Sequence, residues 1–116
     1  MEARAIARGV GMSPRKMRLV IDAIRGKDVN EAYGILRFSK KAAAEPIDKV
    51  LRSAVANAVY KADQDGEVLD VDELFVREAF VDEGPTLKRW KARAFGRATP
   101  IRKRSSHVTV VVDTKE

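Results

Sequence analysis

Residues 84–104 concentrate the side chains best suited to chemistry, since eight of these 21 residues are Lys or Arg and none is acidic. The 21 residues before them, 63–83, hold nine acids and a single base, Arg77. Guanidinium and ammonium groups at this density bind polyanions, most often nucleic acid. A run of like charge also repels itself, so its counter-charge must lie nearby or in a partner. The pattern therefore predicts a segment that binds a polyanion.

The sequence offers little for catalysis. The chain has no cysteine, and His107 is its single histidine; the neighbouring Ser105 and Ser106 are adjacent in sequence rather than placed as a triad. The acids between residues 63 and 73 lack the glycine and terminal glutamate of a calcium loop, and no phosphate loop or dinucleotide fingerprint occurs. We expect no catalytic residue, cofactor or metal, and we interpret His107 as a polar strand residue or an RNA contact.

Length, charge and composition limit the number of domains and the class of protein. A chain of 116 residues predicts one domain, 1–116. Net charge is +6, with +5 in residues 1–27, +2 in 28–62, −8 in 63–83 and +7 in 84–116. The absence of cysteine excludes disulfides, no apolar run approaches the length of a membrane span, and the first ten residues lack the apolar stretch of a signal peptide. We expect a soluble intracellular protein with a core of Val, Ile, Leu and Ala.

The first elements follow from periodicity and breakers. Residues 2–8 alternate as in a strand. A helix should then start at Ser13–Pro14 and stop at Gly26, because Ser suits the N-cap, Pro the first helical position and Gly the stop. Its apolar stripe is Met17, Val20, Ile21 and Ile24. The first turn holds Arg15, Lys16 and Arg18, which the positive helix end disfavours unless an anion such as phosphate binds there; the alternative is solvated surface cations.

Two further helices and two strands complete the prediction. One helix starts at Asp28 and the next is capped by Ser39; within the latter, Pro46 marks either the true start near 45–46 or an irregular first turn or two, and we favour the irregular turn. Strands are predicted at 68–83 and 98–113, joined by the basic segment. They should pair as a hairpin whose distal part, about 84–104, projects as an arm with the acidic stretch at its base.

Three long motifs carry a resemblance to a known family. These are SPRKMRLVIDAIRGKDVNEAYGILRF, KVLRSAVANA and FVDEGPTLKRWKARAFGRATPIRKRSSHVTVVV. Together they closely resemble the large-subunit ribosomal protein L22 (uL22) family over essentially the whole chain. The resemblance implies an α+β fold, with three helices packed on a small antiparallel sheet and a long protruding β-hairpin. It also implies a bacterial or organelle-type member located in the ribosome, cytoplasmic unless organelle-encoded.

The resemblance also implies a function and partners. Members are structural proteins of the 50S subunit that bind 23S rRNA and support assembly, and their hairpin tip lines the exit tunnel beside protein L4, in contact with the nascent polypeptide and linked to macrolide sensitivity. Together with the charge pattern it gives candidate rRNA-binding residues: Arg4, Arg8, Ser13, Arg15, Lys16, Arg18, Lys88, Arg89, Lys91, Arg93, Arg97, Arg102, Lys103, Arg104, Ser106 and His107. Mapped by motif, the tunnel tip is Lys88, Arg89, Trp90, Lys91, Ala92, Arg93, Ala94, Phe95, Gly96 and Arg97.

The tip departs from the usual family pattern at three positions. Ala92 stands where Pro is frequent, Phe95 where a Lys or other polar residue is usual, and Trp90 where a smaller apolar residue or Phe is more common. Two aromatic residues could stack on bases instead of facing the tunnel. Composition alone also allows a DNA-binding architectural protein with a basic β-arm, although Pro85 and Pro100 flank this arm where a DNA-bending arm usually has its wedge at the tip. A third and remote hypothesis is that the protein is an enzyme.

Overall fold

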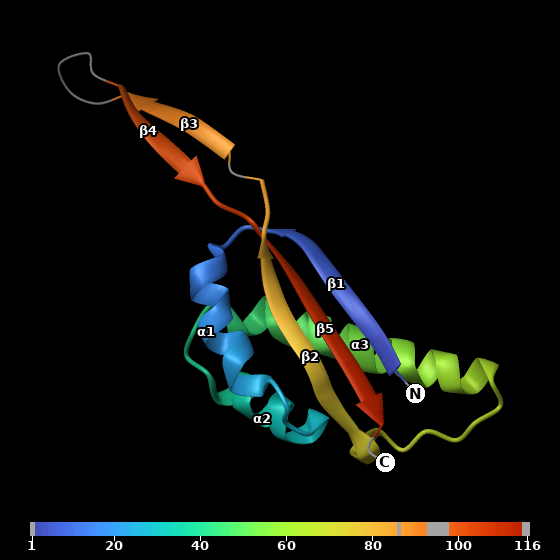
Figure 1. Ribbon diagram of the computed structural model, residues 1–116. Helices are drawn as coiled ribbons and strands as arrows, with labels where there is room; N and C mark the ends of the chain where they lie inside the picture. The colour runs from blue at the N-terminus through green and yellow to red at the C-terminus, as the bar shows by residue number, and fades with distance from the viewer. Residues whose placement is uncertain (1, 86, 93–97, 115–116) are drawn as a thin grey trace.

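Figure 1 shows the computed structural model, which describes residues 2–85, 87–92 and 98–114, with only the backbone described for 87–92 and 98–103. The sheet β1–β5–β2 is antiparallel in that order, and β3 pairs antiparallel with β4. Three helices pack on the sheet, which confirms the α+β class. The elements are β1 (Glu2–Val10), α1 (Pro14–Ile24), α2 (Val29–Phe38), α3 (Ala44–Gln64), a 3-10 turn (Val71–Glu73), β2 (Leu74–Glu83), β3 (Leu87–Ala92), β4 (Ala98–Lys103) and β5 (Ser106–Thr114).

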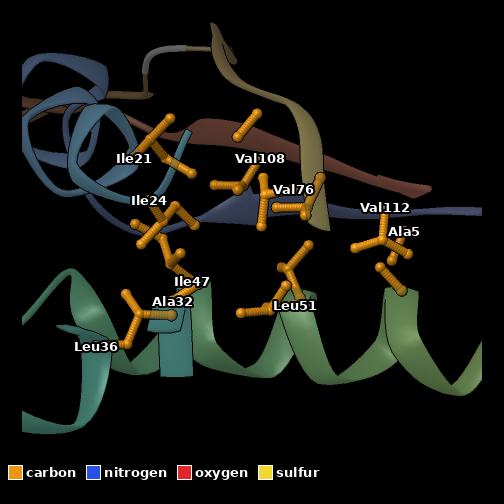
Figure 2. Close-up of a cluster of buried hydrophobic side chains, with 14 of the residues drawn as sticks. Ala5, Ile21, Ile24, Ala32, Leu36, Ile47, Leu51, Val76, Val108 and Val112 are labelled. Carbon is orange, nitrogen blue, oxygen red and sulfur yellow. The ribbon is translucent and has the colours of Figure 1, made fainter. Parts of the chain in front are cut away.

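The core is a layer of aliphatic side chains between the helices and one face of the sheet (Figure 2). The stripe predicted for the first helix lies in it, since all four of its members are buried. On β5, alternate residues point inward, and Val108, Val110 and Val112 are fully buried. From α3, Ile47 and Leu51 fill the space below the sheet. The prediction of a Val, Ile, Leu and Ala core is confirmed.

The start of the third helix differs from the prediction. Ser39 ends α2, where its backbone N–H donates to the carbonyl of Leu36 at 3.4 Å, and α3 begins only at Ala44. Pro46 is therefore the third residue of α3. The first four backbone N–H groups of a helix have no intrahelical acceptor, so proline costs no bond there. The irregular first turn that we favoured is wrong, and the start near 45–46 is the better description.

The strand predicted from residue 68 also starts later, at Leu74, after the 3-10 turn. β2 runs from Leu74, paired with Thr114, to Glu83, paired with Ser106 beside the arm. The acids at 63–73 precede β2 and so lie at the end of the body away from the arm (Figure 1). The prediction that the whole acidic stretch lies at the base of the arm is therefore wrong. Of this stretch, only the acids at the end of β2 lie there.

Arginine side chains of α1 and its C-cap cover the free edge of β2. The Nε and Nη2 atoms of Arg18 donate to the carbonyl of Val81 at 3.2 and 3.0 Å. The same atoms of Arg25 donate to the carbonyl of Ala79 at 3.1 and 2.7 Å. An uncovered edge strand offers unpaired backbone groups to other chains. These two guanidinium groups therefore fix α1 to the sheet and close its edge.

The opposite edge, on β1, is covered by α3. The side-chain amide of Asn57 donates to the carbonyl of Arg4 at 2.9 Å, and the ammonium group of Lys61 donates to that of Glu2 at 3.0 Å. Small residues make this approach possible, since Ala54 and Ala58 on α3 are fully buried. Both edges of the body sheet are thus occupied by side chains from the layer of helices.

The β3–β4 ribbon projects from the body (Figure 1). The molecule measures 67 × 28 × 16 Å and its Cα radius of gyration is 17.6 Å, where a compact chain of this length has about 13 Å. In the ribbon, Lys88 stands opposite Arg102. Like charges directly opposite destabilise a strand pair, and a two-stranded ribbon is marginal in water. The ribbon therefore suits a negatively charged counter-surface.

Candidate nucleic-acid interface

Many Lys and Arg side chains are engaged within the chain. Arg77, at the bulge of β2, lies 3.0 Å from the carboxylates of both Glu2 and Asp113, so one side chain ties the three body strands together. Exposed pairs of this kind contribute little stability, but they neutralise the cations involved. Further pairs join Arg25 to Asp22, Lys27 to Glu31, Lys49 to Glu45 and Arg52 to Asp48.

The side chains of a second group of exposed Lys and Arg residues have no hydrogen-bond or ion-pair partner in the described part of the chain. Most of them gather where the arm leaves the body, around the start of α1 and the loop between α2 and α3. Exposed unpaired cations gathered at one end make a surface that attracts anions. The group, named here the unpaired cations, comprises Arg4, Arg8, Arg15, Lys16, Lys40, Lys41 and Arg104.

An open groove of about 690 Å³ lies among these cations. It is bounded by the start of α1, the loop between α2 and α3, and the base of the arm. Three of its lining residues are Lys or Arg and none is acidic, while Leu19 exposes 61% of its surface. The lining is Gly11, Met12, Ser13, Lys16, Leu19, Lys41, Ala42, Ala43 and Arg104. The lining thus combines apolar and basic residues, and we call its apolar residues the floor and its Lys and Arg residues the rim.

The base of the arm is held by a small polar cluster. The backbone N–H of Gly84 donates to the carbonyl of Ser105 at 3.0 Å, and the Ser105 hydroxyl donates to the carbonyl of Pro85 at 2.7 Å. The Nδ1 atom of His107 accepts from the backbone N–H of Gly9 at 3.1 Å. Gly9 has a φ of 68° at the irregular end of β1, a conformation that favours glycine. His107 therefore has a structural partner, and its other ring nitrogen has none among the residues that the structure describes.

The structure assigns different places to the serines and to Arg18. Ser13 is half-buried at the N-cap of α1, lines the groove, and makes no side-chain capping bond. Ser106 is fully buried, and its hydroxyl donates to the carbonyl of Met12 at 2.6 Å, so its side chain is not presented to a partner. The guanidinium group of Arg18 donates to the carbonyl of Val81 at the edge of β2, so it is engaged within the fold. Of these candidates, Ser13 alone lies in the groove.

The arm candidates are described only in part. Those in β3 and β4 are placed by backbone alone: Lys88, Arg89, Trp90, Lys91, Ala92, Arg102 and Lys103. The rest of the proposed tip, Arg93, Ala94, Phe95, Gly96 and Arg97, lies outside the described residues. Arg104 is exposed at the start of the return into the body. The assignment of the tip therefore stays a prediction.

Sequence reasoning missed two features of this surface. Lys40 and Lys41 belong to the loop that forms one wall of the groove, but the predicted helix start at Ser39 had placed them inside a helix. Leu19 was passed over because it falls outside the apolar stripe of α1. The available signal was Pro46, because proline suits the first turn of a helix, which places Lys40 and Lys41 ahead of the helix start.

Beyond its cations, the described part of the chain shows few groups with unusual chemistry. Burial raises the pKa of Tyr33, partly offset by Arg52. Burial also acts to raise the pKa of Asp113, but hydrogen bonds, including one from the backbone of Thr114, and the charge of Arg77 lower it overall. No cluster of three potential metal ligands occurs among the described residues, and no helix in this part is long and apolar enough to cross a membrane.

Comparison with known proteins gives a consistent result. A family profile described as ribosomal protein L22p/L17e matches residues 5–113. A protein of Desulfitobacterium hafniense (strain DCB-2), named large ribosomal subunit protein uL22, is 58% identical over 115 residues, covering 99% of this chain and 96% of the relative. A protein of the same name from Bifidobacterium longum (strain DJO10A) is 56% identical over 116 residues, covering 100% of this chain and 98% of the relative.

Proposed function

This chain belongs to the ribosomal protein L22p/L17e family, and we propose that it binds 23S rRNA and supports assembly of the 50S subunit. As a family member it is a structural protein of the large ribosomal subunit, located in the cytoplasmic ribosome, and not an enzyme. The DNA-binding alternative is set aside, because the family match spans nearly the whole chain.

The observation that carries the rRNA proposal is the division of the cations. Several cations on or next to the helices are paired with acids, whereas those that gather at the start of α1 and around the base of the arm have no ion-pair partner among the described residues. A folded domain gains nothing from leaving like charges together and unpaired, so their position favours a polyanionic partner. Arg4, Arg8, Arg15, Lys16 and Arg104 are the body residues that we propose to contact phosphates.

We also propose a role for the arm in the exit tunnel. Residues 1–116 would act as one L22-like domain whose arm, residues 84–104, passes inward through rRNA so that its tip lines the tunnel near protein L4 and the nascent polypeptide. The projecting ribbon supports this proposal in two ways. It extends well beyond the body, and it places Lys88 opposite Arg102, a like-charge pair that negatively charged surroundings would stabilise.

A salt titration of 23S rRNA binding tests the rRNA proposal. Replacing Arg102, Lys103 and Arg104 together by Ala should flatten the slope of log affinity against log salt by about two units, since each lost phosphate contact removes about 0.7–0.9. A matched control removes three cations that are paired with acids of the helices, Lys27, Lys49 and Arg52, and should leave the slope nearly unchanged. Equal slopes for the two triple variants would exclude Arg102, Lys103 and Arg104 from the rRNA-binding surface.

A further inference from the structure

We propose that the groove between α1 and the α2–α3 loop is a pocket for a single unpaired RNA nucleotide, with the base on the apolar floor and its phosphates on the basic rim. This inference rests on the proposed rRNA function and names a subsite within it. The groove lies beside the arm, so a strand that follows the arm to the body would reach it.

The lining matches the two halves of a nucleotide. The floor consists of Met12, Ala42, Ala43 and Leu19, and together they offer an apolar surface that a base could cover. Sequence-specific RNA recognition usually targets unstacked bases, which pack on apolar, aromatic or guanidinium surfaces. A volume of about 690 Å³ falls within the usual range for small-ligand sites, about 300–1,000 Å³.

The rim selects a negatively charged occupant. Lys16, Lys41 and Arg104 come from three separate segments of the chain, and no acid lines the groove. Among the described residues, none of the three side chains has an ion-pair partner, so their charges are available to an incoming phosphate. A protein segment with an apolar side chain would satisfy the floor but not this rim. Charge complementarity therefore favours RNA.

The floor is also fixed in position before any ligand binds. The buried hydroxyl of Ser106 donates to the carbonyl of Met12 at 2.6 Å, and this joins the loop before α1 to β5. Across the groove, the loop before α3 is shaped by Lys41, whose backbone N–H donates to the Ser39 hydroxyl at 3.3 Å and whose carbonyl accepts from the N–H of Ala44 at 3.1 Å. A preformed site loses less entropy on binding.

The test uses the full chain and naked 23S rRNA. Leu19→Ala should weaken binding about five- to tenfold, because it removes apolar surface that the base would cover. It should leave the salt slope unchanged, because no charge is removed. The matched control is Val68→Ala, since Val68 is fully exposed in the loop at the other end of the body, and its affinity should equal that of the parent chain.

A second variant approaches the groove from its other wall. Ala42→Trp should obstruct the groove and weaken binding by a similar factor, and circular dichroism verifies that both variants are folded. In the parent complex, one nucleotide should be protected from base-directed chemical modification and become reactive with either variant. Unchanged rRNA affinity in both variants would overturn the nucleotide pocket. If the variants keep their rRNA affinity but enter 50S particles less well, a neighbouring protein occupies the groove instead. Failure of the parent chain to bind rRNA would instead refute the proposed function.

Discussion

Arg15 and Arg18 lie three residues apart on α1, and the structure gives them opposite roles. Arg18 donates twice to the carbonyl of Val81 on the free edge of β2, whereas Arg15 is exposed and has no partner among the described residues. We predict that Arg18→Ala destabilises the fold, while Arg15→Ala leaves stability intact and weakens rRNA binding. Each variant serves as the control for the other.

The cost of losing Arg18 can be worked from its two bonds. A hydrogen bond from a charged donor contributes about 1.5–3 kcal/mol. Here both N–H groups share one acceptor at an edge that water can reach after truncation, so we expect about 1–1.5 kcal/mol for the pair. The unfolding entropy of a chain of this length is roughly 0.24 kcal/mol/K. The melting temperature should therefore fall by about 4–6 °C.

Thermal melts followed by circular dichroism, together with salt titrations of rRNA binding, separate the two roles. Arg15→Ala should keep the melting temperature within about 2 °C, as expected for a surface substitution, and flatten the salt slope by about 0.7–0.9. An unchanged melting temperature for Arg18→Ala would mean that the guanidinium group does not hold the edge of β2. An unchanged slope for Arg15→Ala would make Arg15 an ordinary solvated cation.

Three further predictions concern the arm, its base and the core. Replacing residues 87–103 by two glycines should lower the melting temperature by less than about 3 °C, because the ribbon projects from the body, and should change drug footprints in the tunnel of ribosomes that contain the shortened protein. Gly84→Ala should destabilise the fold, because a Cβ there would lie 2.5 Å from the Ser105 hydroxyl oxygen; adding Ser105→Ala should restore most of the loss in thermal melts. Leu51→Ala should cost about 2–5 kcal/mol in urea unfolding, since Leu51 is fully buried in the core.

The sequence predicted those elements whose side chains repeat at a regular period. The stripe from Met17 to Ile24 and the alternation from Val108 to Val112 both face the core, because burial of apolar side chains dominates where each element packs. The fold class followed from these periods together with the family resemblance. In β2 the alternation is shifted by the bulge between Val76 and Glu78, so that Ala79 and Val81, and not Phe80, share the buried face with Leu74 and Val76.

The prediction failed where short-range signals competed. Ser39 is a good N-cap residue, but it ends α2, and the five residues from Ser39 to Ala43 form the loop that walls the groove. Val68 and the acids around it alternate like a strand, yet this segment pairs with no strand in the described part of the chain and leads into a 3-10 turn. Local pattern cannot reveal whether a partner strand is present.

The spacing of the cations on α1 could have predicted which of them contact the sheet and which stay exposed. At 100° per residue, positions seven apart fall within about 20° of each other around a helix. Arg18 and Arg25 are seven apart and each directly follows a member of the buried stripe, Met17 or Ile24, so both border the core and can reach the neighbouring strand. An arginine side chain in that position readily donates to a backbone carbonyl of its own fold.

Arg15, Lys16 and Leu19 fall on the side of α1 away from the stripe, where no element of the body covers them. A leucine at such a position gains nothing from folding, and two adjacent cations beside it repel each other. A bound anion with an apolar surface would offset both, and an RNA nucleotide has both properties. The residues that weaken the helix on its own are therefore the ones that we expect its partner to use.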